Sequence, residues 1–517
     1  APRAGAAEGE LFAARLESIA LGMGHVLERT ALSPNIRDRL DFSCAVLDAD
    51  GTLVQNAPHL PVHLGALGVA TRAVARALDL AEGDVAVVNH PAFGGSHLPD
   101  VTTVAPVHLE GARVAYVAVR AHHAEIGGTR PGSFPPDARS LAEEGVVLAP
   151  FLAVSRGAFD RDGARARFAG GPHPSRNPDE NLADLEAQLA ATRHGVDGVR
   201  ALAAELGAEG FARRAADELA RAERALLRAV AARPPAARTA TRLLDDGTPI
   251  TASVAVADGR LRIAIASPVA RHPRNFNAPR AVTQAAAMYA LRLFVDEPVA
   301  MNEGLLRAVD LEIAPSMLAP AFDRDPARCP PVVAGNVETS QTVVAVLVEA
   351  LGLSAESQST MNNVLFGNAA FGVYETLGGG AGAGPAYAGA SAVHVHMSNT
   401  RLTDVEVLER RAPVIVRAFR VRAGSGGAGR HPGGDGLVRS YEFRTPVSLS
   451  FFGSRRVHAP AGMAGGAPGA CGTQHATVGG GAIDARASVL SLELGAGDVF
   501  TVETPGGGGW GAPAADG

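Results

Sequence analysis

The chain has 517 residues, of which 47% are hydrophobic and 19% charged, and its formal net charge is only −6. This composition is typical of a globular protein, and the length predicts about three domains. A nearly neutral chain offers no basic field for nucleic acid or an anionic membrane surface, and we find no apolar run of about 18 residues that would predict a membrane span.

The first part of the chain, residues 1–175, is predicted to be a mixed α/β domain. Apolar residues at steps of three and four predict a helix from about residue 7 to residue 32. The stretch DFSCAVLDADGTLVQ predicts a hairpin that turns around residues 48–51. Further strands are predicted in three stretches: DVAVVNH, TTVAPVHL and ARVAYVAVRAHH.

Three further regions follow along the chain. Residues 176–238 carry the pattern of long amphipathic helices, which end at RPPAAR. Residues 239–420 are predicted to form a central α/β domain, with a hairpin in ITASVAVADGRLRIAIAS and a helix over 282–294. Residues 421–517 alternate strand-like stretches with glycine clusters. The whole is predicted to be a mixed α/β (α+β), multi-domain protein with mixed sheets, a helical insertion and a glycine-rich, β-rich C-terminal region.

Two biases in composition bear on function. Many of the 60 glycines cluster toward the C-terminus without a fixed period, which predicts tight turns and close backbone approaches rather than a disordered tail. The chain contains no lysine, a bias that GC-rich codon usage explains. Its absence still excludes a Walker-type phosphate loop and a lysine Schiff base from this chain. A reaction that consumes ATP would therefore need another polypeptide to bind the nucleotide.

The cysteines and the first residues favour a cytoplasmic location. Cys44, Cys329 and Cys471 are widely separated and odd in number, so they predict neither a disulfide framework nor a Cys-x-x-Cys metal site. The opening stretch APRAGAAEGELFAARL lacks the basic start and apolar run of a secretory signal.

Two short stretches carry metal-ligand residue types. GGSHLPDV places His97 and Asp100 three residues apart across a proline, which excludes a helix interior and lets a tight turn point both side chains to one side. In VRAHHAEIGG, alternation along the strand sends His122 and His123 to opposite faces, so at most one of them should join the same site.

Asp41, at the start of the predicted hairpin, would add a second carboxylate. Two imidazoles and two carboxylates suit Mn²⁺, Fe²⁺ or Zn²⁺ and leave positions open for water or substrate. The residues alone leave a surface hydrogen bond between His97 and Asp100 as the alternative.

Collinear motifs along nearly the whole chain resemble the signature stretches of the hydantoinase B/oxoprolinase family. They are SPNIRDRLDFSCAVLDADG, HLPVHLGAL, GGSHLPDV, AHHAEIGG, GNVETSQTVVAVLVEAL, STMNNVLFG, YETLGGGAGAGP, SAVHVHMSNTR, GSGGAGRHPGGDG and ETPGGGGWG. The resemblance implies a subunit of an N-methylhydantoinase, 5-oxoprolinase or caprolactamase, or of an acetone or acetophenone carboxylase. It also implies a partner, the hydantoinase A subunit, that binds ATP.

Carried over by position, the resemblance implies a divalent metal (Mn, Zn or Fe) held by His97, Asp100 and His122, with Asp41 as the fourth ligand. His123 would then face away from the metal. The candidates for proton transfer are His123, His394 and His396. The stretch HVHMSN is predicted to be a strand that puts the last two on one face, where they would reach the same cavity or else be core histidines. Glu375 and Asn399 are further candidates.

The chain departs from the family pattern at two positions and is distinctive at a third. It has His90 where the family usually has aspartate, and Glu125 where aspartate is more common. It also carries Arg130 ahead of its Pro-Gly-Ser element. These positions leave the ligand set intact and bear on substrate identity.

Three functions follow as hypotheses. The first is an ATP-dependent cyclic-amide hydrolase, a cytoplasmic hetero-oligomer with at least two copies of each subunit. In it a metal-bound water would attack a ring carbonyl phosphorylated by the partner. The second is a carboxylase, in which the same metal would hold an enolate formed from a phosphorylated ketone. The third is a non-catalytic scaffold for the ATP-binding subunit.

Overall fold

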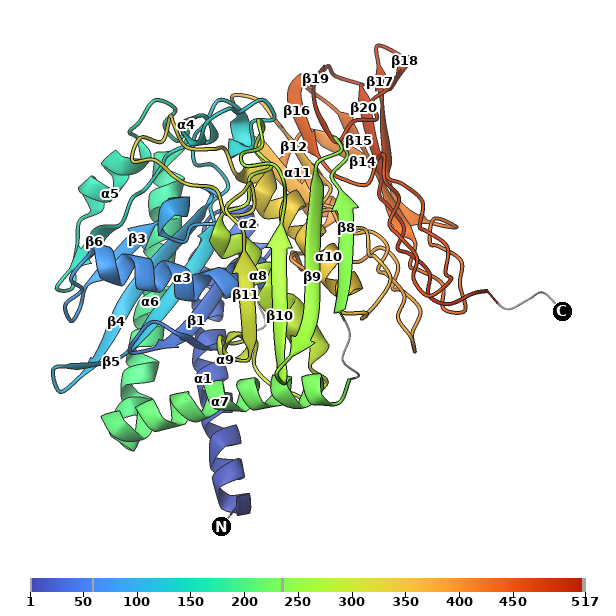
Figure 1. Ribbon diagram of the computed structural model, residues 1–517. Coiled ribbons are helices and arrows are strands. Elements are labelled where there is room, and N and C mark those ends of the chain that lie inside the picture. The colour runs from blue at the N-terminus through green and yellow to red at the C-terminus, as the bar shows by residue number, and fades with distance from the viewer. Residues whose placement is uncertain (1, 58–59, 234–236, 514–517) are drawn as a thin grey trace.

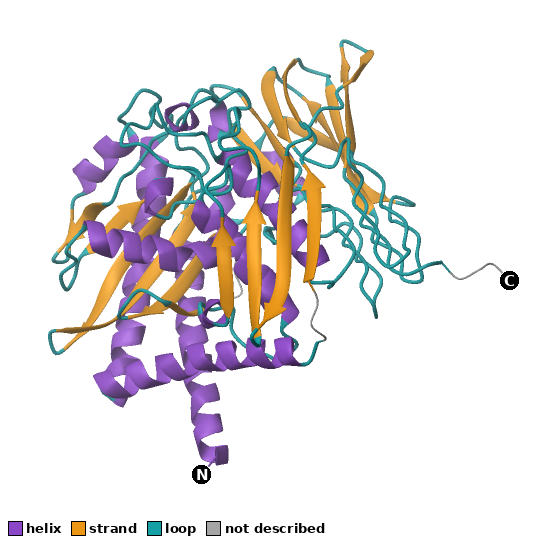
Figure 2. Cartoon of the chain, viewed as in Figure 1, coloured by secondary structure: helices purple, strands orange, loops and turns teal. Residues whose placement is uncertain are grey.

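The strands of the computed structural model form four sheets within residues 2–57, 60–233 and 237–513, which the structure describes, with side chains described from residue 7 on. The first two sheets lie among the long helices, whereas the C-terminal end consists mostly of strands and loops (Figure 1, Figure 2). The predicted mixed α/β class with several sheets is confirmed.

The first sheet is antiparallel and is covered by helices on both faces. On β1, Cys44 and Val46 pack with α1 (Pro2–Thr30) and α6 (Pro178–Leu206), whereas Ala45 and Leu47 face the core that contains α3 (Pro61–Ala77). The predicted first helix, hairpin and three strands are all present. The strand order is β2 (Leu53–Asn56), β1 (Phe42–Asp48), β5 (Ala112–His122), β4 (Asp100–Leu109), β3 (Val85–Val88), β6 (Phe151–Ser155) and β7 (Ala158–Phe159).

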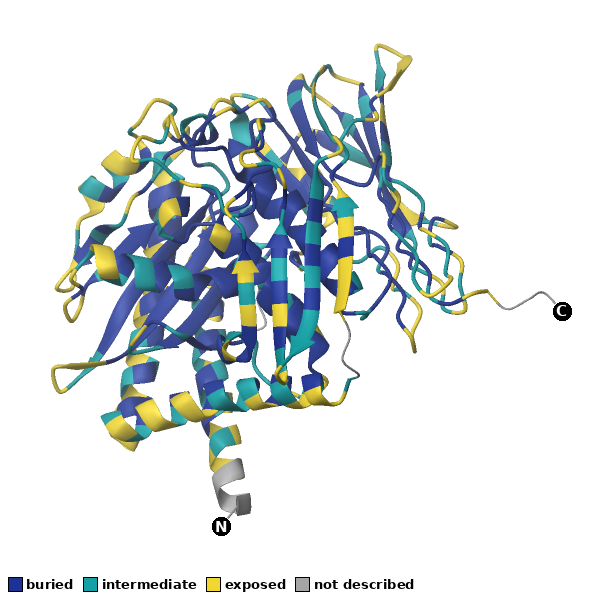
Figure 3. Ribbon diagram, viewed as in Figure 1, coloured by how far each residue is buried: buried dark blue, intermediate teal, exposed yellow. Residues whose placement is uncertain are grey.

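The central sheet contains the predicted second hairpin and packs one face on helices. Alternate residues of its strands, such as Ile250, Ala252 and Val254, point into the core, while the other face is more exposed (Figure 3). The strand order is β11 (Val309–Ile313), β10 (Arg260–Ala266), β9 (Pro249–Ala257) and β8 (Ala237–Leu243), and the associated helices are α7 (Ala208–Ala231), α8 (Arg280–Phe294) and α10 (Ser340–Ala350).

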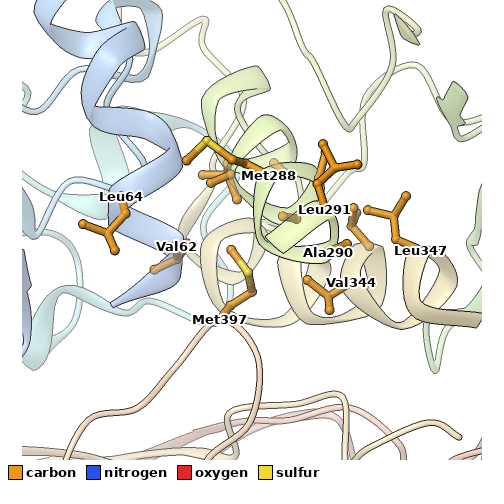
Figure 4. Close-up of a cluster of buried hydrophobic side chains, with 14 of the residues drawn as sticks. Val62, Leu64, Met288, Ala290, Leu291, Val344, Leu347 and Met397 are labelled. Carbon is orange, nitrogen blue, oxygen red and sulfur yellow. The ribbon is translucent and has the colours of Figure 1, made fainter. Parts of the chain in front are cut away.

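The largest hydrophobic core joins the first two sheets through α3, α8 and α10 (Figure 4). Met288 and Leu291 on α8 lie between Leu64 of α3 and Leu347 of α10. The helices approach closely because Gly65 has no side chain: a Cβ there would lie 2.3 Å from the Cα of Ala285. Fixing α3 in this way matters for the site, because α3 also carries a histidine of the cavity described below.

Two C-terminal sheets pack face to face around a core that includes Phe366, Tyr441 and Phe451. In the first of these sheets, strands from before residue 420 pair with strands from after it, across a predicted domain boundary. The strand order of the first of these sheets is β13 (Gly372–Thr376), β12 (Asn363–Gly367), β16 (Val447–Phe452) and β19 (Val489–Leu494). The strand order of the second is β14 (Val414–Arg422), β15 (Gly436–Phe443), β20 (Val499–Glu503), β17 (Thr473–Val478) and β18 (Gly481–Asp484).

The glycine clusters are ordered loops whose bare backbones bond to one another. Gly434 N donates to Ala381 O, and Gly507 N donates to Gly434 O, both at 2.9 Å. A Cβ on Gly507 would lie 2.0 Å from Ala381 O, so this packing requires glycine. The predicted close backbone approaches are therefore present.

Short helices complete the described chain: α2 (Pro34–Arg37), η1 (Pro91–Phe93), η2 (Pro131–Ser133), α4 (Leu141–Glu144), α5 (Arg161–Phe168), α9 (Gly304–Arg307), η3 (Gly335–Thr339) and α11 (Val405–Arg411). Of the helices that the structure describes, none has an apolar stretch long enough to cross a membrane.

His90, one of the departures from the family pattern, caps the short helix η1. Its Nδ1 accepts a hydrogen bond from Ala92 N at 3.1 Å, the bond that an aspartate at this position would accept with a carboxylate oxygen. The ring is buried between Phe93 and Phe322, and burial lowers the pKa of His90 to about 4. The cap therefore depends on a neutral imidazole.

We expect His90 to make the protein acid-sensitive. Because its folded pKa lies below the ordinary value of 6.5, this contribution to stability is complete above pH 6.5 and is lost as the pH falls through about 4. The difference corresponds to roughly 3 kcal/mol. His90→Asn keeps a capping oxygen but does not titrate, so its melting temperature should fall less between pH 7 and pH 4.5 than that of the wild type. Equal falls in both proteins would contradict this role.

Candidate metal centre

A tight turn before β4 brings His97 and Asp100 together. Gly94 adopts φ 85°, and a Cβ on Gly95 would lie 1.9 Å from Asn89 O, so both glycines of GGSHLPDV are required by the turn. Asp100 N donates to His97 O at 3.1 Å, and the His97 Nε2 atom lies 3.2 Å from Asp100 Oδ1. The spacing of the motif therefore aims an imidazole and a carboxylate at one point.

His122 and Asp41 join this point through the sheet. Asp100 and His122 are directly opposed in the β4–β5 ladder, and His122 Nδ1 lies 3.4 Å from Asp100 Oδ1. His122 N donates to Asp41 O, which places the Asp41 carboxylate 3.8 Å from His122 Nδ1. The four residues that the sequence indicated are thus brought together at one end of the first sheet.

His63 on α3 also belongs to this cluster, and the sequence analysis assigned it no role. Its Nε2 lies 3.3 Å from Asp100 Oδ2, and its Nδ1 lies 3.3 Å from Ser43 Oγ. The available signal was its place in HLPVHLGAL, one of the stretches that carried the resemblance. Contact between a helix and a carboxylate 37 positions further along is a tertiary feature that no local spacing encodes.

The buried atoms of this cluster fit a divalent metal. One ligand atom each from His97, Asp100 and His122 lie within 4.8 Å of one another. Both ring nitrogens of His97, His122 Nε2 and Asp100 Oδ1 are buried without a hydrogen-bond partner among the described residues. Buried polar atoms are seldom left unpaired, and neutral imidazole with ionised carboxylate is the donor set that such ions take.

The protonation states agree with this fit. Burial lowers the pKa of His97, which favours the neutral ring that a metal ligand needs. Burial opposes ionisation of Asp100, but the neighbouring His97 and His63 outweigh it and hold the pKa of Asp100 well below its ordinary value.

A buried arginine supports Asp100 from behind. Ser96 Oγ donates to Asp100 Oδ2, and Arg120 Nη1 donates to Ser96 Oγ at 3.4 Å. Arg120 also donates to Thr102 Oγ1 at 2.8 Å and to Gly94 O at 2.9 Å. It is fully buried, and burial lowers its pKa to about 10. This network fixes the carboxylate and ties it to the turn that carries His97.

Aromatic rings enclose the cluster. Tyr374 stacks on His122 at 5.3 Å between ring centroids, and Phe134 meets His97 edge-on at 5.8 Å. The two rings also stack on each other, with centroids 5.4 Å apart, and the adjoining cavity has a volume of about 20 Å³. It is lined by the cluster and by Leu60, Val62, Asn336, Val337, Met361, Tyr374, Thr376, Ser398 and Thr400. These residues come from widely separated parts of the chain.

Glu125, the second departure from the family pattern, anchors the loop that carries Phe134. Its carboxylate accepts hydrogen bonds from Gly127 N and Gly132 N and pairs with Arg176 at 2.8 Å. Arg130 is more exposed and lies 3.6 Å from Asp137.

The candidates for proton transfer lie in different surroundings. His123 points away from the cavity, as alternation predicts, and contacts Gln188 Oε1 at 2.9 Å and Asn181 Nδ2 at 3.1 Å. His396 Nδ1 lies 3.4 Å from Tyr289 Oη. His394 lies beside Arg39 and Thr376, and burial lowers its pKa to about 4.

The strand predicted for HVHMSN was wrong. The stretch is a loop after an isolated bridge at Val393, and His396 has φ 56°, which a strand does not allow. His394 and His396 therefore do not share a strand face. Glu375 pairs with Arg439 and Tyr441 inside the C-terminal sandwich, and the exposed Asn399 is not among the residues that line the cavity.

Comparison with known proteins gives a consistent family assignment. Residues 6–513 match the family model described as hydantoinase B/oxoprolinase. The chain is 40% identical to 5-oxoprolinase 1 of Arabidopsis thaliana over 97% of its own length and 41% of that protein. It is 28% identical to the caprolactamase subunit beta of Pseudomonas jessenii, over 87% of this chain and 80% of that one. The chain thus spans about two fifths of the curated 5-oxoprolinase.

Two solved structures share the fold. The crystal structure of ATP-dependent caprolactamase from Pseudomonas jessenii superposes with a TM-score of 0.86 at 24% identity, covering 98% of this chain and 91% of that chain. Acetone carboxylase in its nucleotide-free form superposes with the same TM-score at 16% identity, covering 98% and 75%.

We expect Ser96 to tune metal affinity although it is not a ligand. Ser96→Ala removes the hydroxyl that joins Asp100 to Arg120, and loss of such an outer partner typically weakens metal binding about 10- to 100-fold. Calorimetric titration of the metal-free protein with Zn²⁺ or Mn²⁺ measures this. Ser316→Ala, an equally buried serine that does not line the cavity, should bind as the wild type does. Unchanged affinity in Ser96→Ala would show that the network does not support the site.

Proposed function

The chain belongs to the hydantoinase B/oxoprolinase family, and from that premise we propose that it is the metal-dependent subunit of an ATP-dependent cyclic-amide hydrolase. Its partner would be a separate hydantoinase A-type subunit that binds ATP. The observation that carries the proposal is the set of unpaired buried ligand atoms of His97, Asp100 and His122 at the wall of a small cavity. The names of the 5-oxoprolinase and caprolactamase relatives support the substrate class.

The chemistry explains why two subunits would cooperate. The carbonyl carbon of a cyclic amide is a poor electrophile until its oxygen carries a phosphoryl group, which the ATP-binding partner would transfer. One water can then add to that carbon, and the carbon–nitrogen bond breaks to release the amine and leave an acyl phosphate. A second water hydrolyses the acyl phosphate to the carboxylate and inorganic phosphate. Overall, one water opens the ring and a second accounts for the hydrolysis of ATP, giving the amino acid, ADP and inorganic phosphate.

The residues of this chain would divide the remaining work. A divalent ion held by Asp41, His97, Asp100 and His122 would supply Lewis acidity, which polarises a carbonyl and lowers the pKa of water. His63, through Nε2, orients Asp100 from the side opposite the ligand oxygen. Tyr374 lines the cavity, and the rings of Tyr374 and Phe134 pack on His122 and His97, where they would limit the access of bulk water.

His394 stays a candidate for proton transfer because it lies beside Thr376, which lines the cavity. Burial lowers the pKa of both His394 and His396 to about 4, so their protonation does not distinguish them. Roles for His123, His394 and His396 stay predictions.

An assay of the two-subunit complex tests the proposal. ADP release should depend on a cyclic amide such as caprolactam or 5-oxoproline, and the ring-opened amino acid should form in equal amount. A carboxylase would instead release ADP with a ketone plus bicarbonate and stay silent with cyclic amides, and that result would overturn the proposal.

We expect His97→Ala to lose turnover by at least about 1,000-fold, because the ion would lose a ligand. Assembly with the partner, measured by light scattering after size exclusion, should be unchanged. His108→Ala, at the far end of β4, is the matched control and should retain activity. Full turnover in His97→Ala would favour the scaffold role.

We also expect the purified chain alone to lack ATPase activity, since it has no lysine for a phosphate loop. Mixing with the ATP-binding subunit should restore substrate-dependent hydrolysis in a heteromer. ATPase activity of the isolated chain that rises with substrate would contradict this division of labour.

A further inference from the structure

Three hydroxyl side chains line the same cavity as the metal ligands and touch one another. Thr376 Oγ1 and Thr400 Oγ1 are 2.8 Å apart, and Ser398 Oγ lies 3.4 Å from Thr400 Oγ1. Thr376 ends β13, and the other two follow in the loop after His396. All three are at least nine-tenths buried. They form a short hydrogen-bonded chain along the cavity wall.

A buried guanidinium sets the direction of this chain. Arg39 Nη2 donates to Thr376 Oγ1 at 3.0 Å and to Thr400 Oγ1 at 3.5 Å, while its Nη1 donates to Tyr374 O at 2.8 Å. Arginine can only donate, so it occupies acceptor sites on the two threonine oxygens. Of the two threonine protons, one can serve the bond between the threonines. The other remains available to Ser398 or to an oxygen in the cavity.

Among the described residues, Arg39 has no carboxylate partner; its guanidinium lies over the ring of Tyr374, with Cζ 4.6 Å from the centroid. Arg39 is 1% exposed, its Nε has no hydrogen-bond partner, and no carboxylate of the described residues lies within 4.0 Å of it. The adjacent Asp38 pairs instead with Arg37 and Arg411. An unpaired buried charge is costly, so this arrangement favours binding of an anion nearby.

The charge balance of the site also favours an anion once a metal ion is bound. The carboxylates of Asp41 and Asp100 line the cavity and would repel an anion in the absence of metal. A divalent ion cancels their two negative charges, and the histidine rings, where neutral, add none. Arg39 beside the cavity and Arg120 behind Asp100 then leave the loaded site positive. Anion binding should therefore require the metal.

The volume limits what can enter. A cavity of about 20 Å³ holds roughly one water-sized group. The metal ligands line this same cavity, so a bound ion would take up part of the space, and a whole phosphate would not fit beside the hydroxyl chain. The rest of the substrate would extend toward the mouth of the cavity.

We propose that Arg39, Thr376, Ser398 and Thr400 form an anion subsite that receives one negatively charged substrate oxygen beside the metal. The hydroxyls contact this oxygen, and Arg39 acts through them as a positioning residue. The inference rests on the proposed function, because it names the charged group that the same site receives. That oxygen belongs either to the phosphoryl group of the activated amide or to a substrate carboxylate, and both present the same acceptor.

Anion binding to the full chain tests this without any turnover. Inorganic phosphate or formate is added to the Zn²⁺-loaded protein, and the dissociation constant is taken from calorimetry and from the rise in melting temperature. Thr376→Val and Thr400→Val preserve shape but remove the hydroxyl, and each should raise the dissociation constant at least tenfold. Thr283→Val, an equally buried threonine whose hydroxyl bonds to Leu318 O, should bind as the wild type does.

The outcomes distinguish a phosphoryl oxygen from a carboxylate oxygen, and failure of the subsite from failure of the proposed function. Tighter binding of phosphate than of formate assigns the oxygen to the phosphoryl group, and the reverse assigns it to a carboxylate. If neither anion binds, or if the valine variants bind as Thr283→Val does, the subsite is overturned. Should a valine variant fail to fold, Ser398→Ala provides the same comparison. A complex that retains hydroxyl-dependent anion binding but hydrolyses no cyclic amide overturns only the proposed function.

Discussion

The pairing of Asp100 with His122 across β4 and β5 is the constraint on which the site depends. Both strands are buried on both faces, with apolar residues packed against α1 and α6 on one side and against the α3 core on the other. A shift of one residue in this register would exchange the two faces of a strand. It would place His123, now bonded to Gln188 and Asn181, where His122 stands, and would bury apolar residues against the wrong layer. Packing along two long strands thus fixes the position of one imidazole relative to one carboxylate.

The electrostatic organisation follows from that point outward. In an interior of low polarity, two carboxylates and several imidazoles at one place are tolerated only if positive charge balances them. Arg120 supplies part of this positive charge through Ser96, which donates to Asp100 Oδ2. Asp100 Oδ1 has no hydrogen-bond partner and is therefore available to bind an ion. Arg39 supplies a second positive charge, but its guanidinium donates hydrogen bonds to hydroxyls and a carbonyl and not to a carboxylate. The described side chains therefore compensate only part of the charge of the cluster, and the cation and the anionic ligand that we propose would supply the rest.

Local patterns in the sequence predicted the parts of the site that local geometry creates. The glycines and the spacing of GGSHLPDV determine the turn, and strand alternation separates His122 from His123. The same reasoning failed at HVHMSN, because its backbone is determined by the neighbouring glycine loops and not by its own pattern; Gly379 and Val393 pair as an isolated bridge. His63 was missed because it lies on a helix 37 positions before Asp100, and a contact over that separation produces no periodic pattern in the sequence. The partnership of Arg39 with Thr376, 337 positions away, required the fold as a whole.

That separation determines how the site is assembled. The segment before β1 carries Arg39 and Asp41, and the C-terminal part carries Tyr374, Thr376 and Thr400. The two are joined at several points: Arg39 bonds to Tyr374 O, Arg401 N donates to Arg39 O at 3.0 Å, and Asp38 pairs with Arg411. The ligand cluster needs only the first sheet and α3, whereas the wall with the hydroxyl chain needs the C-terminal sandwich. The candidate ligands and the hydroxyl wall that we propose to contact the substrate therefore come from different parts of the fold, and Arg39 forms one of the contacts that hold the two together.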